Sequence, residues 1–195
     1  MKQVLILTFL LMMLITACSS NITPNTQYYL LNSPSQANKG VVNNENRALV
    51  ALKLIELPDY LKQPSLVLQL SDHQLHYSHF HIWADPLQVS LAEALSQDLN
   101  TIDSHNYYIT ESTLSTATVK TDIVVKLSAF HVTHQSQAIL AGSYWFQHRG
   151  MKNQEKKYNF KLLLALEDDG YPHAVDKMRK AVTQLAADIA TKLKN

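Results

Sequence analysis

Alternating apolar positions predict three long strands in the second half of the chain, at 122–133, 138–149 and 156–166. In the first strand one apolar face is predicted: Ile123, Val125, Leu127 and Ala129. In the third strand every second residue is large and apolar, which also predicts a buried face. Short polar turns at 134–137 and 150–155 separate the three runs, so an antiparallel meander is expected.

Shorter apolar runs predict additional strands in the first half of the chain. They lie at 27–31, 48–57, 65–70 and 107–110, with prolines or polar residues at their ends. The stretch 32–47 is polar and contains five asparagines together with proline and glycine. It therefore predicts a long loop.

A strong helical pattern lies in 84–100. Leucines recur there at every fourth position: Leu87, Leu91, Leu95 and Leu99. Asp85 is predicted to cap this helix, with Pro86 in its first turn and Gln88 completing a capping box.

A second helical pattern follows the turn at 168–172. Its apolar residues step by three or four positions: Val175, Met178, Val182, Leu185, Ile189 and Leu193. Strands in series with two helices, rather than strict alternation, predict an α+β fold. The expected architecture is a mixed, largely antiparallel sheet packed against two main helices at about 86–100 and 172–193.

The beginning of the chain has the features of a secretory signal. Lys2 supplies a positive charge, 4–15 is almost wholly apolar, and small residues precede Cys18. The apolar run is shorter than the roughly 20 residues that a transmembrane helix needs. Residues 1–17 are therefore predicted to be a signal peptide that is removed.

Residues 15–18, Ile-Thr-Ala-Cys, resemble the lipobox of bacterial lipoproteins. That resemblance implies cleavage before Cys18 and fatty acyl chains such as palmitate on its sulfur and amino group; an ordinary signal with a stray cysteine is the alternative. Ser19, rather than an aspartate, resembles the rule for sorting to the outer membrane. The polar stretch 18–26 predicts a flexible lipidated leash, which leaves 27–195 as a single periplasmic domain.

The charge balance restricts the classes of partner. The chain has 17 Lys and Arg against 16 Asp and Glu, and loss of Lys2 with the signal peptide makes the balance even. Such neutrality argues against nucleic acid as a partner and against membrane binding by charge alone. Since Cys18 is the only cysteine, an acylated chain has no thiol for a disulfide.

Signatures of catalysis or of a resident metal are missing from the sequence. Four glycines in the whole chain cannot assemble a phosphate loop or a dinucleotide fingerprint. Four histidines lie close together, at His73, His76, His79 and His81, and short histidine-rich tracts of this kind can bind metal adventitiously. On a strand, however, His79 and His81 share one face while His76 takes the other, so convergence on one ion is not expected. We expect no catalytic residue, no cofactor and no physiological metal.

Five short segments together resemble the outer-membrane lipoproteins of PqiC type, also described as ABC-type transport auxiliary lipoproteins. They are Tyr28-Tyr29, Leu57-Pro58-Asp59-Tyr60-Leu61, Trp83-Ala84-Asp85-Pro86-Leu87, Gly142-Ser143-Tyr144-Trp145 and Asp169-Gly170-Tyr171. The resemblance spans nearly the whole mature chain. It implies a periplasmic domain, anchored to the periplasmic face of the outer membrane, that docks a periplasm-spanning MCE-domain protein and its inner-membrane partner.

The same resemblance implies that the protein works by binding and that it forms a homo-oligomer. The alternative is a periplasmic lipid carrier that holds an acyl chain in its own pocket between the helices and the sheet. The apolar faces of the strands and helices are expected to fill one another, which favours docking.

Four aromatic residues are the candidate contacts with a partner or a second copy: Tyr28, Tyr29, Tyr60 and Trp83. Tryptophan is enriched at interface hot spots, but Trp83 directly precedes a helix and is also expected as a core aromatic at the corner between strand and helix. Tyr28 and Tyr29 must point to opposite faces of a strand, so one of them is expected to be exposed.

Overall fold

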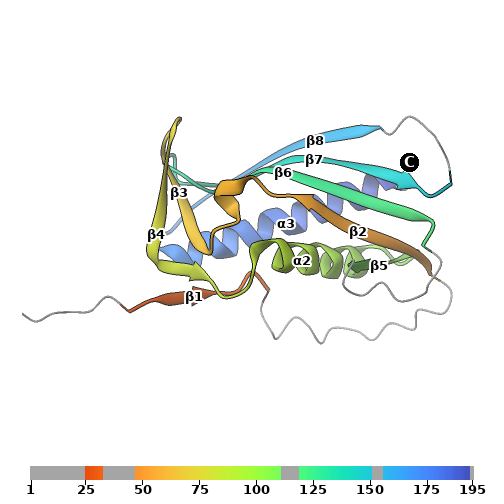
Figure 1. Ribbon diagram of the computed structural model, residues 1–195, viewed down its shortest axis with the longest axis horizontal. Coiled ribbons are helices and arrows are strands. Elements are labelled where there is room, and N and C mark those ends of the chain that lie inside the picture. Colours follow the sequence, from red (N-terminus) through yellow and green to blue (C-terminus); the bar gives the residue numbers. More distant parts are fainter. Residues whose placement is uncertain (1–24, 33–46, 111–118, 151–155, 194–195) are drawn as a thin grey trace, which may run out of the picture.

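The computed structural model describes residues 25–32, 47–110, 119–150 and 156–193 (Figure 1). Within these ranges the strands are β1 (Gln27–Tyr29), β2 (Ala48–Glu56), β3 (Ser65–Ser71), β4 (Gln74–Trp83), β5 (Asn106–Thr110), β6 (Thr121–Thr133), β7 (Gln137–His148) and β8 (Lys157–Ala165). The helices are α2 (Leu87–Ile102) and α3 (Tyr171–Leu193), with a short 3-10 helix, η2 (Asp59–Leu61), between β2 and β3. The predicted signal peptide, Cys18 and most of the predicted 32–47 loop lie outside the described residues.

The strands form one mixed sheet, and the expected α+β class is confirmed. Its two longest ladders join β6 to β7 and β7 to β8, and both are antiparallel, as the predicted meander requires. Leu140 of β7, for example, lies between Phe130 of β6 and Leu162 of β8. On the other side of β6, β2 pairs in parallel with both β6 and β5.

The other edge of β6 is shared by two strands. Its first half pairs in parallel with β2, and Val132, near its end, pairs in parallel with Leu68 of β3. Between these two pairings the chain leaves the sheet and forms η2. The sheet therefore divides at β6: one part continues through β2 to β5, and the other continues through β3 to β4 and β1.

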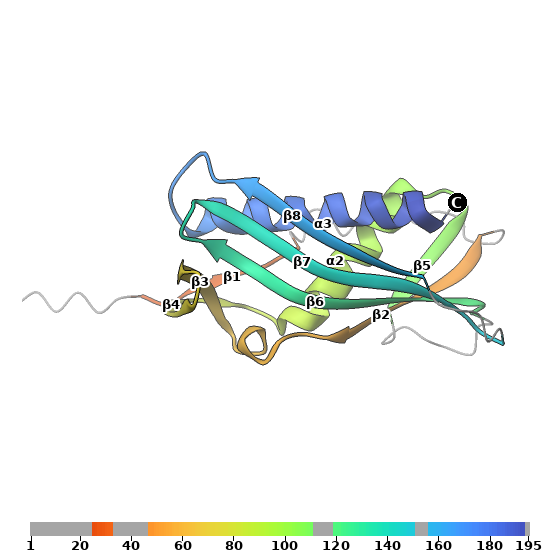
Figure 2. The same ribbon diagram turned by 90° about the horizontal axis from the view of Figure 1, so that it is seen from above.

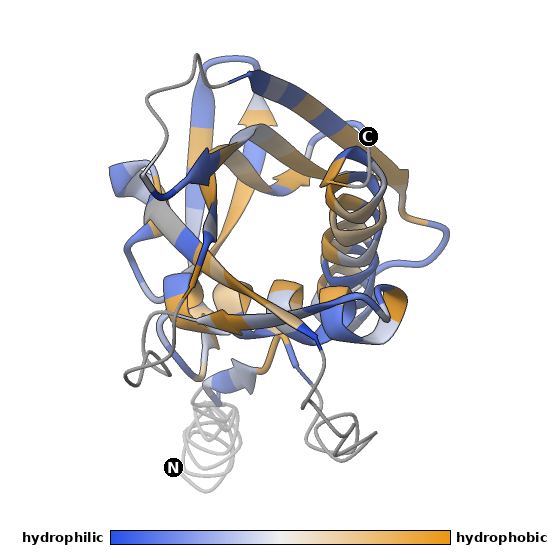
Figure 3. Ribbon diagram, turned by 90° about the vertical axis from the view of Figure 1, so that its right-hand side faces the viewer, coloured by the Kyte–Doolittle hydropathy of each residue, from blue (hydrophilic) through white to orange (hydrophobic). Residues whose placement is uncertain are grey.

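Both helices pack on the sheet, which curves around them (Figures 2 and 3). α2 contacts β2 and β5, α3 contacts β6, β7 and β8, and the helices contact each other. The predicted apolar stripes are buried in one core, including Leu91, Leu95 and Leu99 of α2 and Met178, Leu185 and Ile189 of α3. This burial is the main favourable contribution to the packing of the helices.

Two polar contacts fix α3 in this position. The guanidinium of Arg179 donates two hydrogen bonds to the carboxylate of Asp98 on α2, with N–O distances of 2.5 and 2.6 Å. Tyr144 of β7 donates from Oη to Oδ2 of Asp188 at 2.7 Å. Burial and this hydrogen bond raise the pKa of Tyr144, which keeps the hydroxyl protonated as a donor.

Several sequence predictions were wrong in detail. β4 was not predicted, although it is a strand of ten residues. The N-cap of α2 is Pro86 rather than Asp85, and no side chain caps it by a hydrogen bond. Instead, the carbonyl of Pro86 accepts hydrogen bonds from the amides of Val89 and Ser90, at 3.0 and 3.1 Å.

No helix within the described ranges combines the length and the apolar character that a membrane crossing requires.

A β-bulge in β6 corrects the predicted core face of that strand. Leu127 pairs with Gly142 and Ala129 with Ala141, so Ser128 is an extra residue without a partner on β7. The bulge reverses the alternation: Leu127 faces the core before it, and Phe130, rather than Ala129, faces the core after it.

Gly142 makes room for this bulge. A Cβ atom at Gly142 would lie 2.2 Å from the carbonyl oxygen of Lys126 and 3.0 Å from the ring of Phe160. The first contact is with backbone, which a change of side-chain rotamer cannot relieve. The bulge and the glycine opposite it therefore depend on each other.

We expect Gly142→Ala to lower the free energy of unfolding by about 2 kcal/mol, because the strand or the bulge must shift to admit the methyl group. Denaturant unfolding of the purified protein measures this loss. Ser143→Ala, in the adjacent buried position, adds no atom and serves as the control. Equal stability of Gly142→Ala and the parent protein would show that the bulge adapts freely.

Candidate functional site

The five segments that carry the family resemblance meet around the division of the sheet. We call the part formed by β1, β4 and β3 (27–29, 74–83 and 65–71) the end sheet, because it stands across one end of the molecule (Figure 1). Tyr28 and Tyr29 belong to it, and Trp83 is its last residue. η2, Gly142 and the start of α3 adjoin it or the β6 bulge.

Tyr60 lies in η2, the short helix between β2 and β3, and contacts the bulge in β6. Its Oη donates to the carbonyl oxygen of Ser128 at 3.0 Å, and it lies 3.3 Å from Nδ1 of His131. The rings of Tyr60 and His131 meet edge to face, with centroids 5.8 Å apart. Tyr60 thus gives a donor to the carbonyl of the extra residue in the bulge.

Burial keeps both rings of this contact neutral. It raises the pKa of Tyr60 to about 12, so the hydroxyl stays protonated and able to donate. It also lowers the pKa of His131, which disfavours a positive charge beside the sheet. The contact is therefore structural in character.

A cluster of three rings, Tyr29, His81 and Tyr171, joins the end sheet to α3. Tyr29 Oη donates its hydrogen to Oε1 of Gln27 at 2.7 Å. Nδ1 of His81 lies 2.7 Å from the same hydroxyl oxygen and is therefore the donor in that contact. The His81 ring stacks on Tyr171, the first residue of α3, with centroids 3.6 Å apart and planes at 12°. The turn before it requires Gly170, whose φ of 103° is unfavourable for residues with a Cβ atom.

Trp83 closes the corner between the end sheet and α2. Its ring stacks on Phe130, with centroids 6.2 Å apart, and both side chains are buried. The backbone amide of Trp83 donates to Pro64, and that of Ala84 donates to Tyr29. Trp83 therefore has the core position that its place before a helix predicted.

The four candidate contact residues differ widely in accessibility. Tyr28 is 67% exposed, whereas Tyr29 and Trp83 are 8% and 6% exposed. Tyr60 is partly buried against the core. The prediction that Tyr28 and Tyr29 face opposite sides of the strand is thus confirmed, and Tyr28 is the member of the set whose ring is free to meet a partner.

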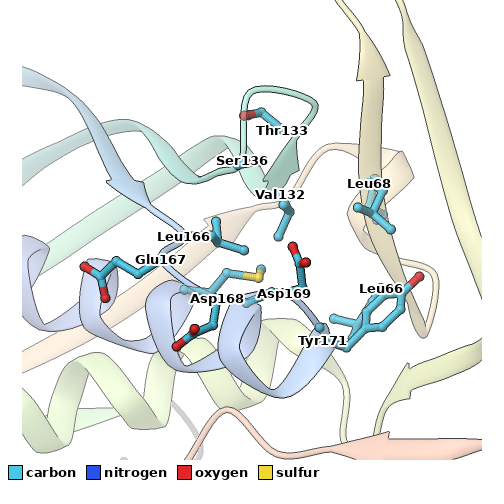
Figure 4. Close-up of a pocket in the computed structure, with 14 residues that line it drawn as sticks. Leu66, Leu68, Val132, Thr133, Ser136, Leu166, Glu167, Asp168, Asp169 and Tyr171 are labelled. Atoms are coloured by element: carbon cyan, nitrogen blue, oxygen red, sulfur yellow. The ribbon is translucent and has the colours of Figure 1, made fainter.

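A pocket of about 420 Å³ lies behind the end sheet (Figure 4). Its walls come from β3, the end of β6, the loop after β8 and the first turns of α3. Leu66, Val132 and Met178 contribute apolar surface, and Asp169 points toward Val132. The neighbouring Glu167 is paired with Lys177 of α3, with an N–O distance of 2.8 Å.

The histidines of β4 are arranged differently from the prediction. The rings of His76 and His79 lie together, with centroids 6.4 Å apart, while His81 stacks on Tyr171. The register between β3 and β4 shifts between Ser65 and Val67, because β4 has extra residues there, and this shift brings His76 round to the side of His79. In the part of the chain that the structure describes, no three His, Cys, Asp or Glu side chains form a group that could hold a metal ion.

Sequence reasoning missed the exposed face of the end sheet. Tyr77 and Phe80 are large, 38% and 42% exposed, and lie on the strand that was not predicted. The three-residue spacing between them does not fit simple alternation, so the strand pattern in 74–83 was hidden. The aromatic content of this segment was the available signal.

Comparison with known proteins agrees with this architecture. Residues 29–190 match the model of a family described as "ABC-type transport auxiliary lipoprotein component". The chain is 27% identical over 180 residues to the intermembrane transport lipoprotein PqiC of Escherichia coli K12, covering 92% of each chain, and a Shigella flexneri protein of the same name matches equally.

Two crystal structures have the same fold. One, of an uncharacterized protein, has a TM-score of 0.72 and 25% sequence identity, and covers 87% of this chain and 99% of the other. A protein from Xanthomonas campestris has a TM-score of 0.62 at 11% identity, and covers 85% and 90% of the two chains. At that identity the second likeness shows the fold alone.

We expect Tyr60→Phe to lower the free energy of unfolding by about 1 kcal/mol, because the Ser128 carbonyl loses its donor while the ring packing is kept. Denaturant unfolding measures the change. Tyr28→Phe removes a hydroxyl from an exposed ring and should stay within about 0.5 kcal/mol of the parent. Equal effects of the two substitutions would contradict a structural role for the Tyr60 hydroxyl.

Proposed function

This chain belongs to the family of ABC-type transport auxiliary lipoprotein components, and on that premise we propose that it is the membrane-anchored docking component of an intermembrane lipid transport system. The family match over residues 29–190 carries the proposal. The relatives named intermembrane transport lipoproteins, matched over nearly their whole length, support it. The family is one of transport components rather than enzymes, so the proposed work is binding and placement.

In the proposed arrangement, Cys18 is the first residue of the mature chain and carries acyl chains in the periplasmic leaflet of the outer membrane. Each buried methylene contributes about 0.8 kcal/mol, and a single chain gives only reversible attachment, so several chains on one residue hold the domain durably. The leash of 18–26 then keeps the domain close to the bilayer.

The partners in this proposal are a periplasm-spanning MCE-domain protein, its inner-membrane partner and further copies of the same chain. Docking needs a rigid body, and the ring cluster and the Tyr60 contact support the end sheet against the rest of the domain. β8 pairs with β7 alone among the described strands, so its other edge offers backbone groups that a strand of a second copy can extend.

A second candidate function is lipid carriage, and the pocket behind the end sheet favours it. Its volume of about 420 Å³ lies within the range of ligand sites in proteins, and part of its wall is apolar. The pocket also has carboxylates at its loop, including Asp168 and Asp169, which suit an acyl chain poorly. Docking therefore remains the proposed function.

We expect Cys18→Ala to abolish acylation and to remove the protein from the outer-membrane fraction. Metabolic labelling with a palmitate analogue and membrane fractionation of cells measure the two effects. Ser20→Ala, two residues away, should change neither and serves as the control. A parent protein that is secreted with an unmodified sulfur at Cys18 would overturn the anchor.

Copurification and lipid analysis distinguish docking from carriage. The acylated protein, extracted in detergent, should recover the MCE-domain partner, and mass spectrometry should find no non-covalently bound lipid. Leu68→Trp narrows the pocket and should leave partner recovery unchanged. Stoichiometric bound lipid in the parent, lost in Leu68→Trp, would instead establish a carrier.

A further inference from the structure

We propose that the outer face of the end sheet, which carries Tyr28, Tyr77 and Phe80, rests in the headgroup region of the membrane to which Cys18 is attached. The inference rests on the proposed function only in its use of the acyl anchor. It adds a second contact with the lipid surface, made by the folded domain itself, and so assigns an orientation to the protein.

Exposed apolar side chains gather at this end of the molecule. Nine large apolar residues are exposed in the part of the chain that the structure describes, and six of them lie on or directly beside the end sheet: Tyr28, Leu30, Leu70, Leu75, Tyr77 and Phe80. The other three, Val89, Ile102 and Leu163, are scattered over α2 and β8. Single exposed apolar residues are ordinary, but a cluster marks a contact surface.

The strand pairings place the aromatic members on one face. Tyr28 pairs with Ile82, and Phe80 precedes Ile82 by two residues, so Tyr28 and Phe80 share a face. The opposite face carries Trp83 and His81, which point to the core and to α3. The face with Tyr28 and Phe80 therefore points away from the body of the domain.

The bulge in β4 returns Tyr77 to this outer face. His76 and His79 are three residues apart and have their rings together, which shows that the alternation slips by one between them. Tyr77 and Phe80 have the same spacing across the same irregularity. Leu75, two residues before Tyr77, shares its face and extends the apolar surface toward the turn.

The surface is almost without fixed charge. Residues 27–32 and 65–83 contain no Lys, Arg or Glu, and Asp72, in the turn between β3 and β4, is their single Asp. Tyrosine and other aromatic rings are enriched where proteins meet the headgroup region, since one end of the ring is apolar and the other can stay hydrated. The composition fits a lipid surface better than an anionic or cationic partner.

The position of the anchor decides between a membrane and a protein as the occupant. Cys18 precedes Gln27 by nine residues, which span at most about 30 Å when fully extended. Gln27 begins β1, the neighbour of β4, and β1 and the β3–β4 hairpin lie at the same end of the molecule (Figure 1). The neutral aromatic face is thus the surface that the anchor holds nearest to the lipid.

A site-specific polarity probe tests the contact. Because acylation consumes Cys18, the Phe80→Cys substitution supplies the single free thiol, which takes a nitrobenzoxadiazole label. Ile102→Cys is the matched control: both side chains are 42% exposed, but α2 ends beside β5 at the opposite end of the domain (Figure 1). Tyr28→Cys, at a side chain that is 67% exposed, gives an independent second probe position.

The labelled, acylated proteins are reconstituted in vesicles of phosphatidylethanolamine and phosphatidylglycerol. We expect the labels at positions 80 and 28 to shift to shorter emission wavelength and to lose intensity when the vesicles contain brominated lipids, while the label at 102 stays unchanged. Flotation of the vesicles reports the acyl anchor separately, so a protein that does not float contradicts the proposed function.

Labels at 80 and 28 that remain in water on a protein that floats would overturn the inference. The same result would follow if those labels became shielded only after addition of a periplasmic MCE domain, because the face would then belong to a protein partner. A label at 102 that is quenched as strongly as one at 80 would also overturn it, since no end of the domain would be preferred.

Discussion

The structure depends on how β6 divides one edge between two neighbours. β2 and β3 both pair with this edge, and between them the chain leaves the sheet to form η2. The Ser128 bulge lies on β6 between the two pairings. The Tyr60 hydroxyl donates to the Ser128 carbonyl, and Gly142 leaves space opposite the bulge. This junction, together with the stack of His81 on Tyr171 and the packing of Trp83 on Phe130, holds the end sheet against the meander and the helices.

The segments that carry the family resemblance have structural tasks around this junction. His81 of β4 stacks on Tyr171 of α3 and contacts the hydroxyl of Tyr29, and Trp83 packs on Phe130, the first core residue after the bulge. Each of these contacts joins side chains of the domain to one another. The family's description as a transport component fits the binding role proposed for this chain.

Local periodicity predicted the meander and both helices, because each depends on neighbours within one element. The burial of Trp83 followed from its place directly before a helix. Periodicity did not predict β4. Extra residues in this strand shift its register with β3, so His76 and His79, three residues apart, lie on the same side instead of alternating. Periodicity also could not predict that β2 and β3 share β6, or the pocket that the loop after β8 completes, since these arise from pairing between distant segments. The candidate contact residues shared one feature, aromaticity, and burial then separated exposed Tyr28 from buried Tyr29.

An acyl anchor fixes where a protein is but leaves its orientation open, and the proposed docking of a periplasm-spanning partner requires both. The even overall charge argues only against membrane binding by charge alone, and it says nothing about where the charges lie. The end sheet is nearly free of charged residues. A neutral aromatic face beside the anchor requires no attraction to anionic lipid, because its association comes from partial burial of rings. In the proposed orientation the opposite end, with β5 and the C-terminus of α3, faces the periplasm, where a spanning partner would arrive.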